Sequence, residues 1–127
     1  MTEPKPRILV VDDNRDSAET LSMLLELMGN EISVAYDGEQ ALAVANEIKP
    51  DVVLLDIGLP KMNGYEVARR IRQEPWGSSP ILVAITGWGQ TEDKDLSRES
   101  GFDHHLVKPV DYDHLLKLIQ KRKGAPA

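Results

Sequence analysis

The chain of 127 residues lacks cysteine, which excludes disulfide bonds and thiolate metal sites. No apolar run approaches the roughly 20 residues that a membrane-spanning helix needs. No signal-peptide pattern precedes the first predicted strand. We therefore expect a cytoplasmic protein without membrane contact.

Positive charge is also scarce. Fifteen Lys and Arg residues stand against twenty-one Asp and Glu residues, which gives a net charge of −6. Because nucleic-acid phosphates need an excess of basic side chains, this balance argues against direct nucleic-acid binding by the domain. A DNA-binding partner or a fused domain is not excluded.

Length and composition predict a single folded domain. The apolar share of 41% and the charged share of 28% are ordinary for a globular protein of this size. No internal repeat or low-complexity tract divides the chain. We expect the domain to occupy residues 7–123, after a flexible lead-in at residues 1–6 and before a short tail at residues 124–127.

Apolar runs and amphipathic stretches alternate five times along the chain. Strands are predicted at Arg7–Val11, Ile32–Tyr36, Val52–Leu55, Pro80–Ile85 and Phe102–Val107. Such alternation predicts an α/β fold with a parallel sheet and right-handed crossovers. The second strand is the most polar and should lie at an edge. We therefore predict a flavodoxin-like (βα)5 three-layer sandwich with strand order 2-1-3-4-5.

Polar capping residues mark the predicted helix starts. The first helix is expected from about Asp16, which has capping-box spacing to Glu19, and its apolar face should extend to Met28. Gly29 should close this helix. The other helices are expected to begin at Asp37-Gly38, after Asn63, at Thr91 and after Asp111.

Polar side chains follow the apolar strands at one edge of the predicted sheet. Asp12-Asp13, Asp56, Thr86 and Lys108 come at the ends of strands one, three, four and five. In this fold the ligand crevice lies outside the carboxyl ends of the strands, where the chain reverses direction. The topology therefore predicts that three carboxylates meet in one crevice.

Three carboxylates repel one another more than a single lysine can offset. A divalent cation can neutralise them, and all-oxygen ligation of this kind suits Mg²⁺. A metal ion with a lysine ammonium and a threonine hydroxyl opposite would hold a phosphoryl group while a carboxylate attacks phosphorus.

Four motifs at these strand ends resemble one family, the receiver domain of bacterial two-component response regulators, of the chemotaxis-regulator type. The resemblance extends over about Arg7 to Lys121. The motifs are ILVVDD at Ile8–Asp13, LLDIGLPKMNG at Leu54–Gly64, ITG at Ile85–Gly87 and LVKP at Leu106–Pro109. Each motif is weak alone, but all four in this order are specific.

The resemblance implies that Asp56 receives a phosphoryl group from a histidine kinase or a histidine phosphotransfer protein. It also implies Mg²⁺ or Mn²⁺ held by Asp13, Asp56 and the carbonyl of Gly58, with Asp12 reaching the ion through water. The implied chemistry is limited to phosphorylation of the domain itself and autodephosphorylation, so the chain would be a signalling module rather than an enzyme.

Further roles are implied for the fourth and fifth strand ends. Lys108 would bind the phosphoryl group, Thr86 would move to bond it on activation, and the Lys108–Pro109 peptide bond would be cis. In this family the signal leaves through the face formed by the fourth helix, the fifth strand and the fifth helix. A phosphorylation-dependent dimer stays open.

Three features depart from the usual pattern of this family. The switch position holds His105 in place of Tyr or Phe, either as a packing substitute or as a group that titrates near pH ~6.5. Gly58 and Trp88 flank the site, where Trp88 is either an exposed loop aromatic or a shield against attacking water. The helix predicted at Thr91–Ser100 has one strongly apolar residue, Leu96, and is either loosely held or simply solvated.

Other functions fit the sequence less well. A dehalogenase-type phosphohydrolase would carry a second Asp two residues after the nucleophile, where this chain has Gly58. A nucleotide-binding module would open its first helix with a Gly-rich loop, which Asp13-Asn14-Arg15 is not. A constitutive docking module would not need the intact set of site residues.

The output stays open between two alternatives. One is a free-standing regulator with a partner protein. The other is the receiver segment of a hybrid histidine kinase, which the Gly101–Asp111 segment resembles in style.

Overall fold

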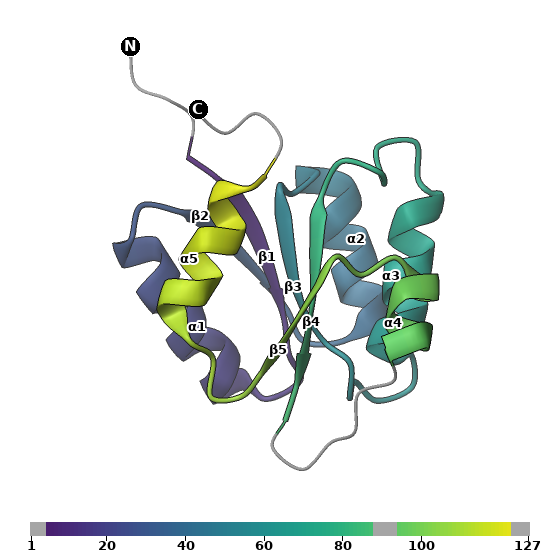
Figure 1. Ribbon diagram of the computed structural model, residues 1–127, viewed down its shortest axis with the longest axis horizontal. Helices are drawn as coiled ribbons and strands as arrows, with labels where there is room; N and C mark the ends of the chain where they lie inside the picture. The colour runs from purple at the N-terminus through teal and green to yellow at the C-terminus, as the bar shows by residue number, and fades with distance from the viewer. Residues whose placement is uncertain (1–4, 88–93, 123–127) are drawn as a thin grey trace.

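A five-stranded parallel sheet with helices on both faces forms the fold (Figure 1). The computed structural model describes residues 5–87 and 94–122. The sheet order β2-β1-β3-β4-β5 confirms the predicted flavodoxin-like topology. The strands are β1 (Arg7–Val11), β2 (Glu31–Ala35), β3 (Val52–Asp56), β4 (Ile81–Thr86) and β5 (His104–Val107). The helices are α1 (Arg15–Leu27), α2 (Gly38–Ile48), α3 (Gly64–Gln73), α4 (Lys94–Ser100) and α5 (Tyr112–Gln120).

The central strands are buried along their whole length. All residues of β3 and of β4 are buried, because helices cover both faces of the sheet. The two strands are accordingly apolar up to their last residues, Asp56 and Thr86. The edge strand β2 is fully buried only at Ala35, as its polar sequence predicts.

Alternation along the strands divides the core into two layers. Successive side chains of a strand point to opposite faces of the sheet. On one face Val10 of β1 belongs to a cluster with Leu25 of α1 and Leu115 of α5. On the other face Val11 belongs to a cluster with Val67 of α3. α4 lies beside α3 (Figure 1). Among the described residues, no helix is both long enough and apolar enough to span a bilayer.

The start of α1 differs from the prediction. Its N-cap is Asn14, whose side chain accepts a hydrogen bond from the backbone N–H of Ser17 at 3.0 Å, so Asp16 lies within the first turn. Met28 is 44% exposed, and its predicted place on the apolar face is wrong, since it is the C-cap residue just beyond the last turn. The predicted caps of α2, α3 and α5 are confirmed at Asp37, Asn63 and Asp111.

The boundaries of four strands, β2 to β5, shift by one or two residues from the predicted ranges. β2 ends before Tyr36, because the Tyr36 N–H is bonded to the side chain of Gln40 at 2.6 Å. β4 extends to Thr86, which pairs with Val107. β5 begins after Phe102, whose N–H closes the end of α4 instead. The first predicted residues of the fourth helix, 91–93, lie outside the described residues.

Candidate functional site

Three aspartates meet at the carboxyl ends of β1 and β3. Asp12 and Asp13 follow β1, and Asp56 ends β3. The parallel register pairs Val11 with Leu55, which brings the two strand ends level. Each aspartate offers a carboxylate oxygen within 4.8 Å of those of the other two. The predicted carboxylate cluster is therefore present in the folded chain.

Two of the three carboxylates are buried and oriented by backbone N–H groups. Asp12 is 6% exposed and Asp56 9% exposed. Oδ1 of Asp12 accepts from the N–H of Asn14 at 2.9 Å, and Oδ1 of Asp56 accepts from the N–H of Gly58 at 2.8 Å. These bonds fix one oxygen of each carboxylate, and Oδ2 of each is turned toward the same cation.

That cation is Lys108, at the end of β5. Its Nζ lies 2.9 Å from Oδ2 of Asp12 and 3.8 Å from Oδ2 of Asp56. The Lys108 backbone N–H donates to the carbonyl of Thr86 at 2.8 Å, which ties the end of β5 to β4. The Lys108–Pro109 peptide bond is cis, which confirms the expectation.

Burial and charge act against each other in this cluster. Burial raises the pKa of the Asp56 carboxyl above its ordinary value, although the Gly58 hydrogen bond and Lys108 oppose the shift. For Lys108, burial alone would lower the pKa, but the hydrogen bond that Nζ donates to Asp12 and the charges of the surrounding carboxylates raise it overall. The Lys108 side chain therefore stays protonated. A further cation beside Asp56 would stabilise the ionised form of its carboxylate, which burial disfavours.

Thr86 is directly joined to His105. Thr86 is 1% exposed, and its Oγ1 lies within hydrogen-bond distance, 2.9 Å, of Nε2 of His105. Both residues were predicted as members of the switch, but the bond between them was not. Because Thr86 is in β4 and His105 is in the neighbouring β5, this hydrogen bond couples the position of the Thr86 side chain to β5.

The last glycine of the turn after β3 is packed more closely than the sequence indicated. Gly64, the first residue of α3, lies so close to the turn that a Cβ there would be 2.6 Å from Cα of Ile57 and 2.7 Å from the carbonyl oxygen of Asp56. Its N–H donates to the carbonyl of Ile57 at 3.2 Å. The LLDIGLPKMNG motif therefore needs its last glycine for close backbone approach. Trp88, expected to be either an exposed loop aromatic or a shield against water, lies outside the described residues.

A cavity of about 570 Å³ opens beside the aspartates, between α1 and the start of α5. Asp12, Asp56 and Lys108 line it, together with Leu21 of α1 and Tyr112 of α5. Tyr112 is 37% exposed at its edge. The Asp56 carboxylate therefore borders an open cavity.

The donor set determines which metal fits. Three carboxylates offer hard oxygen ligands, which suit Mg²⁺ or Mn²⁺ better than a metal that prefers nitrogen or sulfur. A divalent cation there would offset the repulsion among the three aspartates. The cluster can therefore hold a metal ion, a nucleophile and a cation for a phosphoryl group side by side.

Comparison with known proteins places these features in a family. The family model described as response regulator receiver domain matches residues 8–120. The DNA-binding response regulator MtrA of Mycobacterium tuberculosis (strain ATCC 25618 / H37Rv) is 39% identical over 122 residues, which cover 96% of this chain and 52% of that protein. The chain spans about half the length of this and other curated relatives that it matches.

Solved structures agree with this match. The chemotaxis protein CheY4 of Vibrio cholerae superposes with a TM-score of 0.86 at 29% identity, covering 94% of this chain and 99% of that one. The receiver domain of the sensor histidine kinase PA1611 from Pseudomonas aeruginosa PAO1 gives a TM-score of 0.84 at 27% identity, with 96% and 100% coverage. The latter structure has a magnesium ion coordinated in its active site cleft.

Proposed function

Because the chain belongs to the response regulator receiver domains of two-component signalling, we propose that Asp56 is its phosphoacceptor. The main support for this assignment is the position of Asp56. It is the one aspartate of the cluster at the end of β3, 9% exposed, with Oδ1 held by Gly58 and Oδ2 facing Lys108. A carboxylate oxygen of Asp56 would attack phosphorus, and the bond between phosphorus and the donor nitrogen of a phosphohistidine would break.

Asp13, Asp56 and the Gly58 carbonyl would hold Mg²⁺ or Mn²⁺, with Asp12 reaching the ion through water. When bound, the metal would offset the charge of the incoming phosphoryl oxygens. Lys108 would release its 2.9 Å contact with Asp12 in part and bind a phosphoryl oxygen. Thr86 would donate its hydroxyl to another phosphoryl oxygen and lose its bond with His105.

The proposed donor is a histidine kinase or a histidine phosphotransfer protein, whose phosphohistidine would reach Asp56 through the cavity beside α1. The output surface would be the face of α4, β5 and α5, acting on a partner protein or a fused domain, or through a phosphorylation-dependent dimer. Free-standing regulator and hybrid-kinase receiver both remain open, and the cytoplasmic location stays a prediction.

Receiver domains are signalling modules rather than enzymes that turn over a separate substrate, and autodephosphorylation of Asp56 belongs to this proposal. The phosphohydrolase alternative is disfavoured because position 58 offers a backbone N–H to Asp56 and no acidic side chain. The docking-module alternative is disfavoured because the chain retains the whole cluster of Asp12, Asp13, Asp56 and Lys108.

The assignment of Asp56 is tested with a small phosphodonor such as acetyl phosphate in the presence of Mg²⁺. Intact-mass spectrometry should show one added phosphoryl group in the wild type and none in Asp56→Asn. Asp113→Asn, an exposed aspartate in the first turn of α5, is the control and should be labelled like the wild type. Labelling of Asp56→Asn to the same extent would overturn the assignment.

A further inference from the structure

Lys108 follows the strand that the apolar core holds least. β5 lies at the edge of the sheet, and of its four residues, His104–Val107, only Leu106 is buried. β1, β3 and β4, which lead to the other site residues, bury four, five and six residues. Because burial of one face is what fixes the register of a strand, the core alone determines the register of β5 weakly.

Hydrogen bonds at both ends of β5 supply this missing constraint. At the carboxyl end the N–H of Lys108 donates to the carbonyl of Thr86 at 2.8 Å. Just before the strand, the N–H of Asp103 donates to the carbonyl of Leu82 at 2.8 Å, and Oδ2 of Asp103 accepts from the N–H of Leu82 at 2.8 Å. The Asp103 side chain therefore serves as the acceptor that a backbone carbonyl would provide in a longer strand.

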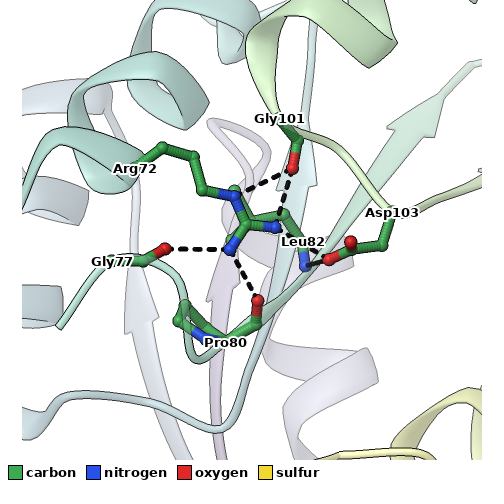
Figure 2. Close-up of polar contacts among 6 residues, drawn as sticks. All are labelled: Arg72, Gly77, Pro80, Leu82, Gly101 and Asp103. Atoms are coloured by element: carbon green, nitrogen blue, oxygen red, sulfur yellow. Dashed lines mark hydrogen bonds and ion pairs between the residues drawn. The ribbon is translucent and has the colours of Figure 1, made fainter.

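Asp103 is itself held by Arg72, the last arginine of α3 (Figure 2). Nη2 of Arg72 donates to Oδ2 of Asp103 at 2.8 Å and to the Gly101 carbonyl at 2.7 Å, and Nε donates to the same carbonyl at 3.0 Å. Nη1 donates to the carbonyls of Gly77 at 2.9 Å and Pro80 at 2.8 Å. All five guanidinium N–H groups are thus used. We call these five residues the Arg72 anchor.

The Arg72 anchor leaves the chain just before β5 little freedom. A Cβ on Gly101 would lie 2.6 Å from Cγ of Arg72, and Gly101 has φ +102°, in the left-handed region. The Arg72 side chain is 21% exposed, so its hydrogen bonds are partly shielded from water. The anchor joins α3, the α3–β4 connection and the start of β5, at the end of the sheet opposite the aspartates.

We propose that Arg72 is a positioning residue: through Asp103 it fixes the register of β5 and so holds the Lys108 ammonium where it meets the phosphoryl group. A slip of one residue would move β5 by about 3.3 Å and turn its side chains to opposite faces of the sheet. Lys108 would then lose its 2.9 Å contact with Oδ2 of Asp12. Because all its donors are used within the anchor, Arg72 acts on the site only through the strand. This role rests on the proposed function of Asp56.

Metal and phosphoryl binding depend on different strands, and this difference tests the role of Arg72. The aspartates that would hold Mg²⁺ lie at the ends of β1 and β3, whereas Lys108 follows β5. In Arg72→Met, beryllofluoride at saturating Mg²⁺ should bind about tenfold more weakly, as expected when a charge-assisted contact is lost. Mg²⁺ affinity, measured by titration calorimetry, should stay the same or rise.

Arg70→Met is the matched control for this experiment. Arg70 lies in the same helix, is exposed, and pairs with Glu66 of that helix at 3.2 Å. Its loss should leave both affinities unchanged. Beryllofluoride binding by Arg72→Met at the wild-type affinity would overturn the proposal. A parallel loss of Mg²⁺ affinity in Arg72→Met would also overturn it, because the anchor would then support the fold as a whole.

The route through Lys108 is tested by a double-mutant cycle. In Lys108→Gln the ammonium is absent, so loss of the anchor should have no further effect on beryllofluoride affinity. The variant Arg72→Met/Lys108→Gln should therefore bind like Lys108→Gln alone. A further loss of about tenfold in the double variant would show that Arg72 acts by another route and would contradict the proposal.

Two substitutions of Asp103 separate closure of the strand from carboxylate charge. Asp103→Asn keeps an oxygen that accepts from the Leu82 N–H and from Arg72, whereas Asp103→Ala keeps neither bond. Asp103→Ala should weaken beryllofluoride binding about as much as Arg72→Met, and Asp103→Asn should bind clearly more tightly than Asp103→Ala. Equal affinities of the two Asp103 variants would show that this closure does not position Lys108.

The Asp56→Asn variant in the same titration separates this role from the proposed function. If Asp56→Asn loses beryllofluoride binding while Arg72→Met binds like the wild type, the role of Arg72 is wrong and that of Asp56 stands. If Asp56→Asn binds as well as the wild type, the proposed function fails and the role of Arg72 fails with it. Loss of binding in Asp56→Asn together with about tenfold weaker binding in Arg72→Met supports both.

Discussion

Oγ1 of Thr86 lies 2.9 Å from Nε2 of His105, so the hydroxyl proposed to meet the phosphoryl group already has a partner on the neighbouring strand. Thr86 is buried, with 1% of its surface exposed, and water competes little for this hydroxyl. When Nε2 of His105 accepts, the Thr86 hydroxyl donates its single proton to the imidazole, and this contact competes with donation to the phosphoryl group. Breaking one to form the other links the aspartate cluster to β5.

Removing the competing contact should favour the phosphorylated state. In His105→Phe the Thr86 hydroxyl loses its imidazole partner, and beryllofluoride should bind with Mg²⁺ about fivefold more tightly, since a hydrogen bond contributes ~1 kcal/mol net. Thr86→Ala is the control and should bind more weakly than the wild type, because no hydroxyl then reaches the analogue. Equal titration curves for His105→Phe and the wild type would remove His105 from the switch.

Lys108 should matter for the phosphoryl group and not for the metal. Lys108→Gln removes the ammonium that lies 2.9 Å from Asp12 and 3.8 Å from Asp56. Beryllofluoride affinity should fall about tenfold or more, as expected for loss of a charge-assisted contact. Mg²⁺ affinity, measured by titration calorimetry, should stay the same or rise, because the aspartates lose a competing cation. Parallel loss of both affinities would show that Lys108 only organises the carboxylates.

Asp56 should lower the stability of the metal-free fold. Burial raises the pKa of Asp56 in the folded state above its value in the unfolded state. The folded state therefore gains stability from protonation of Asp56. This gain is complete below the unfolded pKa and is lost as the pH rises through the folded pKa. In EDTA, Asp56→Asn should therefore be more stable than the wild type at pH ~7, and the difference in stability should shrink toward pH ~4. Urea unfolding measures both. A pH-independent gap would assign the effect to packing.

Close backbone approach makes Gly64 indispensable to the turn after Asp56. Gly64→Ala should cost about 1–3 kcal/mol of unfolding free energy, because its Cβ would lie 2.6 Å from Cα of Ile57. The control is Gly29→Ala at φ +96°, where a Cβ meets nothing within 4 Å and only backbone strain is added. Mg²⁺ affinity should fall in Gly64→Ala and not in Gly29→Ala. Retained stability in Gly64→Ala would show that the turn relaxes freely.

The site could be predicted from the sequence because its members are local signals at strand ends. Asp12, Asp56 and Lys108 each follow an apolar run, and parallel strands bring such ends to one edge. The caps at Asp37, Asn63 and Asp111 were equally readable, since a cap bonds to an N–H three residues on.

Contacts between distant segments could not be predicted in this way. Arg72 reaches Gly101 and Asp103, 29 and 31 residues away, and most of its acceptors are backbone carbonyls that carry no residue-type signal. The bond between Thr86 and His105 depends on side-chain orientation across two strands. The start of α1 differs from the prediction because Asn14 and Asp16 are both good caps, and residue type alone does not distinguish them.

The most direct test of the central claim is beryllofluoride binding with Mg²⁺ to the wild type and to Asp56→Asn, followed by nuclear magnetic resonance. The wild type should bind one analogue and show shifted resonances at Thr86, His105 and Lys108. Asp56→Asn should show none of these changes at the same concentrations. Identical spectral changes in the two proteins would contradict the assignment of Asp56 as phosphoacceptor.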